Sequence, residues 1–203
     1  MIIKKGGRCV LPFFVFCKTV KEAFALEKRV THNKNLLEEL DSIVLSLLAI
    51  VLVFSFGVRI CRVDGSSMNP GLLDGERVLI SSLPYRPAYG DVVVVDSDIE
   101  YGKPLVKRVI GLPGDTIDID FGSGVVYRNG QALDEPYTAE PTYLKEEKDF
   151  PLTVPAGSLF VMGDNRNHSL DSRSTEIGFI DERDILGKAL FRIMPFNKAG
   201  AIK

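Results

Sequence analysis

Histidine, cysteine and tryptophan are scarce in this sequence. Its 203 residues include two histidines, three cysteines and no tryptophan. Cys9 and Cys17 precede the longest apolar run, and Cys61 lies at the end of that run. The chain after Cys61 therefore has no cysteine pair to oxidise, and neither a disulfide framework nor a zinc site is expected there.

Positive charge is also scarce in the greater part of the chain. Residues 63–203 carry fifteen Lys and Arg against twenty-two Asp and Glu, whereas residues 1–62 carry ten against five. The basic residues are thus confined to one end and are not spread over a folded face, as a nucleic-acid-binding surface requires. No nucleic acid is expected as a partner.

Charge is absent altogether from Ser42 to Val58, which read SIVLSLLAIVLVFSFGV. A helix of this length is about 25 Å long, slightly short of a bilayer core of about 30 Å. Ile60 and Cys61 extend the apolar surface if Arg59 directs its head group outward. The run predicts a single transmembrane helix at 42–61, and the alternative is a helix buried in a soluble core.

Basic residues gather before this run. Eight Lys and Arg precede it, and only Arg59 and Arg62 follow it closely. The positive-inside rule places the N-terminus in the cytoplasm. We therefore expect a cytoplasmic segment at 1–41, a helix across the cytoplasmic membrane at 42–61 and an extracytoplasmic domain at 62–203, with membrane lipid as a partner.

A second apolar patch, CVLPFFVFC at Cys9–Cys17, is similar to the core of a secretory signal peptide. The charged KTVKE that follows does not suit a cleavage region, and so short a patch cannot span a bilayer as a helix. We interpret it as an interfacial or loosely packed cytoplasmic segment.

Short segments rich in β-branched residues dominate the remainder. Gly, Pro and Asp separate these segments, which lie at 76–83, 90–98, 104–112, 115–121, 124–133, 157–164 and 188–196. Asn129-Gly130 is typical of a type I′ hairpin turn. The pattern predicts a mainly β fold, an antiparallel β-barrel or folded sheet preceded by the single N-terminal transmembrane helix. Residues 134–152, rich in proline and charge, predict a long surface excursion.

Two adjacent serines, Ser66 and Ser67, lie in the turn-forming stretch VDGSSMNPG. A serine hydroxyl becomes a good nucleophile only when a base lies within hydrogen-bond reach. His32 would lie on the other side of the membrane, and His168 stands in the polar GDNRNHSLDSR, which is typical of an exposed loop. A Ser-His-Asp triad is therefore not expected.

Lysine is the remaining candidate base. Lys107 stands in PLVKRVIGLPG, a β-branched run in which successive side chains point to opposite faces. If Arg108 points to solvent, Lys107 points to the apolar side, where desolvation lowers the pKa of an amine from about 10.4. A general base near neutral pH requires such an amine. The alternative is a lysine whose head group reaches water or pairs with a carboxylate.

Three segments, GSSMNPGLLDGERVL, KRVIGLPGD and GDNRNHSLDSR, follow the apolar run in this order. Together they resemble bacterial type I signal peptidases, over residues 42–195. The first segment alone is shared with self-cleaving repressors of the LexA type, whereas the third is far more specific. The resemblance implies a membrane-bound Ser–Lys peptidase that needs no metal or other cofactor, with Ser67 as nucleophile and Lys107 as general base.

The resemblance also implies supporting residues. Ser169 would orient the lysine ammonium, and Asp171 and Arg173 would brace the site. Without the resemblance, this pair would read as a surface salt bridge worth at most about 1 kcal/mol. Some family members have a serine two residues before the nucleophile whose hydroxyl helps to hold the oxyanion. Here that residue is Gly65, so a donor besides the Ser67 N–H must come from elsewhere.

The implied substrate is an exported preprotein whose signal peptide ends in an Ala-x-Ala-like site. A peptide with small residues at alternate positions suits binding as an added strand, along an edge formed by residues 62–67 and 104–107. Met68, Leu72 and Leu73 would either touch the bilayer surface or pack in the core. The alternatives are a Ser–Lys peptidase specialised for a pilin or conjugation substrate or for its own chain, and a non-catalytic anchored binding module.

Overall fold

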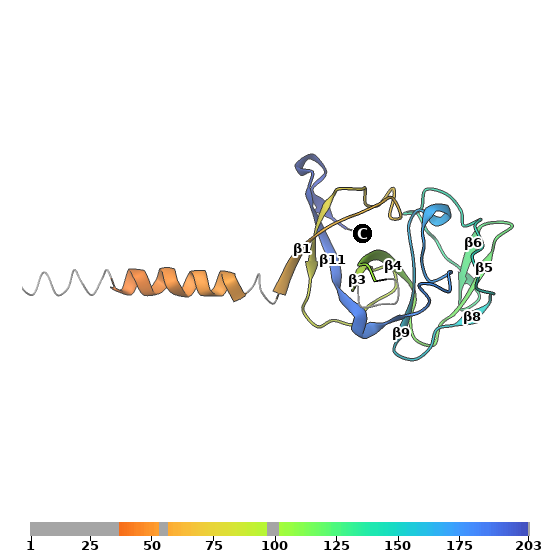
Figure 1. Ribbon diagram of the computed structural model, residues 1–203, viewed down its shortest axis with the longest axis horizontal. Helices are drawn as coiled ribbons and strands as arrows, with labels where there is room; N and C mark the ends of the chain where they lie inside the picture. The colour runs from red at the N-terminus through yellow and green to blue at the C-terminus, as the bar shows by residue number, and fades with distance from the viewer. Residues whose placement is uncertain (1–36, 53–56, 97–101, 203) are drawn as a thin grey trace, which may run out of the picture. The chain divides into compact units, whose positions relative to one another are not determined.

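The computed structural model describes residues 37–52, 57–96 and 102–202 (Figure 1). The chain divides into two units, Met1–Leu52 and Val53–Lys203. The patch at Cys9–Cys17 and His32 lie outside the described residues, so the interpretation of that patch stays a prediction.

Residues 37–52 form an α-helix whose leucine, isoleucine and valine side chains are exposed. Across the ranges that the structure describes, no helix combines the length and the apolar character needed to cross a membrane. The predicted C-terminal boundary at residue 61 is wrong, because Val58–Arg62 form strand β1. β-branched Val58 and Ile60 favour a strand, and the segment pairs with β2 from Val58↔Ser81 to Arg62↔Arg77.

The second unit is mainly β and antiparallel, as predicted, and forms a half-barrel. Within the described residues its larger sheet has eight strands in the order β1-β2-β11-β3-β4-β9-β10, with β12 paired to β11. The strands are β1 Val58–Arg62, β2 Arg77–Ser81, β3 Val92–Val95, β4 Leu105–Gly111, β9 Ser158–Met162, β10 Ile180–Asp181, β11 Ile185–Met194 and β12 Gly200–Ala201. Register shifts in β11 against β2 and β3 are the kind of irregularity that bends a sheet.

A smaller sheet has the order β7-β6-β5-β8. Its strands are β5 Thr116–Asp120, β6 Val125–Arg128, β7 Gln131–Ala132 and β8 Leu152–Thr153. The predicted turn at Asn129-Gly130 is confirmed, because both residues have positive φ, 53° and 77°, and Arg128 pairs with Gln131. Short 3₁₀ helices of the described part of the chain are η2 Arg166–His168, η3 Glu182–Asp184 and η4 Phe196–Lys198.

The larger sheet is buried on both faces around β3. Val92 and Val94 pack in one apolar cluster and Val93 and Val95 in another, as the alternation of side chains along a strand requires. The first cluster is Val63, Met68, Leu72, Val78, Ile80, Val92, Val94 and Ala189. Met68 and Leu72 are thus core residues, and Leu73 is half-buried, so this structure favours core packing over contact with a bilayer.

Candidate active site

Ser67 and Lys107 lie together although 40 residues separate them in the chain. The Lys107 Nζ donates a hydrogen bond of 2.8 Å to Ser67 Oγ. Lys107 comes from β4, opposite Val93 of β3, and its side chain is only 2% exposed. Ser67 is half-buried. The two side chains that the sequence pointed to as nucleophile and base are therefore in contact.

Burial is the main influence on the Lys107 amine. It lowers the pKa from an ordinary value of 10.5 to about 8, because a charged ammonium loses hydration in the interior. The nearby Asp171 carboxylate raises the pKa of Lys107 and partly opposes burial, whereas the Arg173 guanidinium lowers it. The result is an amine that is neutral in a substantial fraction of molecules in mildly alkaline solution.

The turn that carries Ser67 is anchored at both ends. Met68 and Leu72 bury their side chains in the core, and the Leu72 N–H donates to Met68 O at 2.8 Å. Before the serine, the Gly65 N–H donates to Asp74 Oδ1 at 2.9 Å. Gly65 has φ +87°, where an L side chain is strained although open space surrounds the position. The backbone conformation at position 65 thus favours glycine.

The backbone of this turn is tied to the segment after β9. The Asn165 N–H donates to Ser67 O at 3.0 Å, and Asn165 Nδ2 donates to Ser66 O at 3.1 Å. A Cβ on Gly163 would overlap both Ser67 O and Ser169 Oγ. Close backbone approach at Gly163 therefore sets the distance between the nucleophile turn and the loop that carries Ser169.

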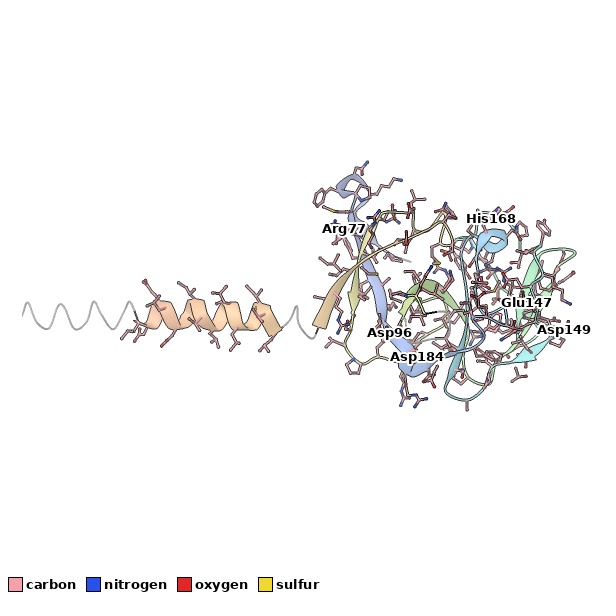
Figure 2. The ribbon with its side chains drawn as sticks, in the orientation of Figure 1. Arg77, Asp96, Glu147, Asp149, His168 and Asp184 are labelled. Carbon is pink, nitrogen blue, oxygen red and sulfur yellow. The ribbon has the colours of Figure 1, made fainter. Side chains whose placement is uncertain are left out.

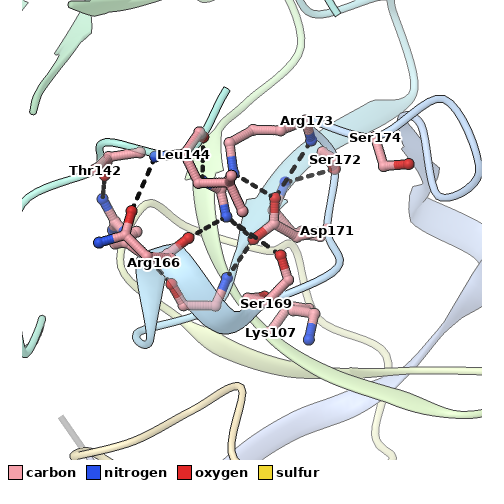
Figure 3. A network of polar contacts seen from close by, with 12 residues as sticks. Lys107, Thr142, Leu144, Arg166, Ser169, Asp171, Ser172, Arg173 and Ser174 are labelled. Atoms are coloured by element: carbon pink, nitrogen blue, oxygen red, sulfur yellow. Dashed lines mark hydrogen bonds and ion pairs between the residues drawn. The ribbon is translucent and has the colours of Figure 1, made fainter. Parts of the chain in front are cut away.

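Asp171 and Arg173 form an ion pair with no exposed surface on either side chain (Figure 3). Arg173 Nε donates to Asp171 Oδ1 at 2.8 Å, and the Gly163 N–H donates to Asp171 Oδ2 at 3.0 Å. Arg173 also donates to Arg166 O at 2.6 Å. An ordinary surface salt bridge is therefore excluded. The contacts of this pair connect residues of the loop after β9 with one another, and the pair lies near Lys107.

Ser169 is 5% exposed and its side chain lies against Gly163. Its Oγ makes no hydrogen bond within the described part of the chain, so a direct bond to Lys107 is not formed here. In this structure it is Ser67 that receives the Lys107 hydrogen bond. The orienting role of Ser169 stays a prediction.

The condition under which Lys107 was placed on the apolar side, an Arg108 side chain pointing to solvent, is not met. The Arg108 side chain is 3% exposed and donates from Nε and Nη2 to the Asp164 carboxylate, at 2.7 and 2.8 Å. The Tyr137 ring lies 3.9 Å from its guanidinium carbon. Tyr137 belongs to the loop between β7 and β8, which covers this face of β4. Both faces of β4 are buried, and the pattern of β-branched residues in a single strand did not reveal this.

The same loop contributes polar partners that the sequence pattern did not predict. Arg166 donates to both oxygens of Glu135, at 2.6 and 2.7 Å, and to Thr142 Oγ1 at 3.3 Å. Thr142 is completely buried, so the excursion is not confined to the surface. His168, by contrast, is exposed at the edge of the unit, as expected for a loop residue (Figure 2).

We expect Asp164→Ala to destabilise the fold by about 3–5 kcal/mol, because it leaves the buried Arg108 charge without its carboxylate. Chemical denaturation measures the change. Asp149→Ala is the matched control, since Asp149 (labelled in Figure 2) forms an exposed ion pair with Lys145. This substitution should leave the unfolding midpoint nearly unchanged. Equal effects of the two substitutions would contradict the importance of the buried pair.

A cleft of about 460 Å³ adjoins the two side chains. Its lining is Cys61, Arg62, Val63, Asp64, Ser67, Met68, Val94, Lys103, Pro104, Leu105, Val106 and Lys107. The expected edges at 62–67 and 104–107 thus both contribute to it. β9 pairs with β4 only from Arg108 onward, so among the described strands none occupies that side of β4 at Leu105–Lys107. The cleft has room beside a strand edge.

Comparison with known proteins shows the family of this chain. The family described as signal peptidase, peptidase S26, matches residues 36–194. A signal peptidase I of Bacillus licheniformis is 38% identical over 85% of this chain and 96% of its own length. Signal peptidase I S of Bacillus subtilis (strain 168) is 36% identical over 84% of this chain and 96% of its own.

Solved structures are similar to this chain as well. One of them is a crystal structure of a signal peptidase I from Enterococcus faecalis V583, at 32% identity and a TM-score of 0.42. The alignment covers 51% of this chain and 97% of that one.

Proposed function

Because the chain belongs to the signal peptidase family, peptidase S26, and has the activity of a signal peptidase I, which cleaves signal peptides, we propose that Ser67 and Lys107 are its catalytic dyad. The observation that carries this proposal is the 2.8 Å contact between Lys107 Nζ and Ser67 Oγ beside the cleft. Ser169, Asp171 and Arg173 would support the dyad.

The reaction begins with the neutral form of Lys107, which accepts the Ser67 hydroxyl proton while Ser67 Oγ attacks the scissile carbonyl carbon. The resulting ammonium then gives a proton to the leaving amine of the mature chain. An acyl group stays on Ser67. A water molecule, deprotonated by Lys107, attacks this ester, releases the signal peptide and restores the serine. The route balances without a metal or other cofactor.

The tetrahedral oxyanion of each step needs hydrogen-bond donors, and the first is the Ser67 N–H. The loss of one such donor typically costs about 3–4 kcal/mol of barrier. Gly65 has no hydroxyl to contribute, and its positive φ disfavours a serine there. The second donor therefore comes from a backbone group or a water.

The cleft suits an extended substrate. Backbone groups of Leu105–Lys107 without a strand partner on one side can pair with a preprotein segment, which would add to the sheet at β4. Apolar side chains such as Val63, Met68 and Val106 line the same cleft. An added strand presents alternate side chains to this surface, which suits an Ala-x-Ala-like site with small residues at every second position.

The experiment that tests the function is cleavage of several preproteins by the detergent-solubilised wild-type chain, with the new N-termini mapped by sequencing. We expect cuts directly after Ala-x-Ala-like sites and none by Ser67→Ala. Cleavage confined to a pilin substrate or to the chain itself would favour a specialised Ser–Lys peptidase. Binding of preproteins without any cleavage would favour a non-catalytic module.

The pH dependence should follow the Lys107 amine. Because the general base must be neutral, kcat/KM should rise with pH through about 8 and become nearly constant above it. Each unit below this value should reduce the rate about tenfold. Initial rates on a soluble preprotein fragment between pH 6 and 10 measure the profile. A flat profile across this range would argue against a buried lysine base.

We also propose that residues 42–58 anchor the chain in the cytoplasmic membrane, with 1–41 in the cytoplasm and 62–203 outside. The support is the uncharged run, the exposed apolar side chains of the helix at 37–52 and the basic residues before the run. Protease added to intact spheroplasts should degrade residues 62–203 and spare an N-terminal tag. Release of the chain by alkaline carbonate would contradict the anchor.

A further inference from the structure

The cleft beside the dyad has a charged end. Arg62 and Asp64 come from the first of its two edges, and Lys103 comes from the residues just before the second. All three side chains are exposed. Positive charge prevails at this end of the cleft, whereas residues 63–203 as a whole are acidic. The proposed mechanism gives these three residues no role.

Arg62 stands beside another positive charge. In the pairing of β1 with β2 it lies directly opposite Arg77, which is also exposed and is labelled in Figure 2. Like charges at directly opposite positions of two antiparallel strands destabilise the pairing. No ion pair among the described residues includes either arginine. An anionic group bound at this end of the cleft would therefore reduce the repulsion between them.

The spacing along the second edge decides which substrate residue meets the charged end. Lys103 precedes Lys107 by four residues, and Val106 of the apolar lining lies between them. An added strand advances at the same rise per residue as β4. If the residue before the scissile bond lies beside Lys107, the fifth residue before the bond lies beside Lys103. The small residues of the Ala-x-Ala-like site then occupy the apolar part of the cleft between the two lysines.

We propose that Arg62 and Lys103 form a subsite for an acidic side chain at the fifth residue before the scissile bond, and that this subsite selects among preproteins. The inference rests on the proposed function, because it takes the cleft as the binding site of the signal peptide. Glutamate or aspartate at this position is favoured over lysine or arginine. Asp64 opposes part of the attraction, and exposed charge pairs are weak, so the selection is a matter of degree.

Cleavage of matched preprotein fragments by the detergent-solubilised chain tests the inference. The fragments carry Glu or Lys at the fifth residue before an Ala-x-Ala site and are otherwise identical. For the wild type, kcat/KM should be about threefold or more higher with Glu than with Lys, because attraction by exposed charges changes to repulsion. Sodium chloride at about 1 M should remove most of this difference, since it screens exposed charges. The same change at the fifth residue after the site should have no effect.

Variants of the two cationic residues identify the source of the preference. Arg62→Gln and Lys103→Gln should each reduce the ratio of Glu to Lys cleavage by about half or more, and Arg62→Glu should reverse the preference. Arg183→Gln is the matched control. It removes a positive charge from an exposed residue that does not line the cleft, and it should keep the wild-type ratio.

Equal kcat/KM for the Glu and Lys fragments in the wild type would overturn the inference. A ratio that stays the same in both the Arg62 and the Lys103 variants would overturn it too, as would a preference seen only when the charge follows the cleavage site. Failure of the proposed function is recognised separately, because in that case no fragment is cut after the Ala-x-Ala site, whatever its charge.

Discussion

Lys107→Ala should reduce signal peptide cleavage by about 10⁴-fold or more, because it removes the amine that contacts Ser67 Oγ and can accept its proton. Lys107→Arg is the more informative substitution. A guanidinium keeps the positive charge and can donate to Ser67, but it does not lose its proton at accessible pH. Both variants should therefore be inactive in single-turnover cleavage of a preprotein.

Circular dichroism and thermal unfolding are the controls for folding of these variants. Lys107→Ala is expected to fold, because Lys107 forms no ion pair with another described residue. The substitution removes mainly the hydrogen bond to Ser67. Substantial activity of Lys107→Arg would show that a positive charge suffices and that a base is not needed. That result would remove Lys107 from the mechanism as its general base.

Gly163→Ala should reduce kcat by about 100-fold or more while the chain still folds. Its new Cβ would overlap Ser67 O and Ser169 Oγ, so the nucleophile turn and the loop after β9 must move apart. A displacement of about 1 Å between reacting groups typically costs this factor. The Asp171 hydrogen bond to the Gly163 N–H would be strained by the same movement. Steady-state kinetics on a preprotein fragment measure the loss.

Gly200→Ala is the matched control, because a Cβ on Gly200 in β12 meets no atom within 4 Å. It should leave kcat and KM unchanged. Wild-type kcat for Gly163→Ala would mean that the turn and the loop tolerate a larger separation than this structure shows. A rise in KM alone would assign Gly163 to the binding of substrate and not to the position of Ser67.

The polar residues around the dyad act as a frame for the loop after β9. Arg108–Asp164, Arg166–Glu135 and Arg173–Asp171 are ion pairs with little or no exposed surface, and each includes a member of residues 164–173. Buried ion pairs contribute uncertain net stability, but the loss of one partner is costly. Their arrangement therefore favours a single conformation of the loop, and through Asn165 and Gly163 a single position of Ser67.

Several predictions from local pattern are confirmed. Asn129-Gly130 forms the expected hairpin turn, because both residues adopt the positive φ that this turn requires. The β-branched segments form strands of an antiparallel fold. The predicted end of the N-terminal helix is wrong, since apolar β-branched residues such as Val58 and Ile60 suit either a membrane helix or a strand. Pairing with β2, which is distant in the sequence, decides between the two.

Some residues of the site could likewise be predicted from the sequence, and others could not. Ser67 and Lys107 could be proposed from the sequence, because each stands in a distinctive segment and few histidines compete for the role of base. The burial of Arg108 could not, because its partner Asp164 lies 56 residues away. The close approach at Gly163 could not be predicted from the sequence either. A glycine that contacts the carbonyl of a distant serine results from the packing of distant segments, which no local pattern records.

By itself, the amino-acid sequence determined the secondary-structure type of the second unit, its hairpin turn and the two side chains available for serine chemistry. These properties depend on backbone preferences and side-chain chemistry, which are local. Only the tertiary structure decided that β4 is covered on both faces and that Lys107 reaches Ser67. Burial and electrostatic coupling depend on which distant segments pack together, so they arise only in the folded chain.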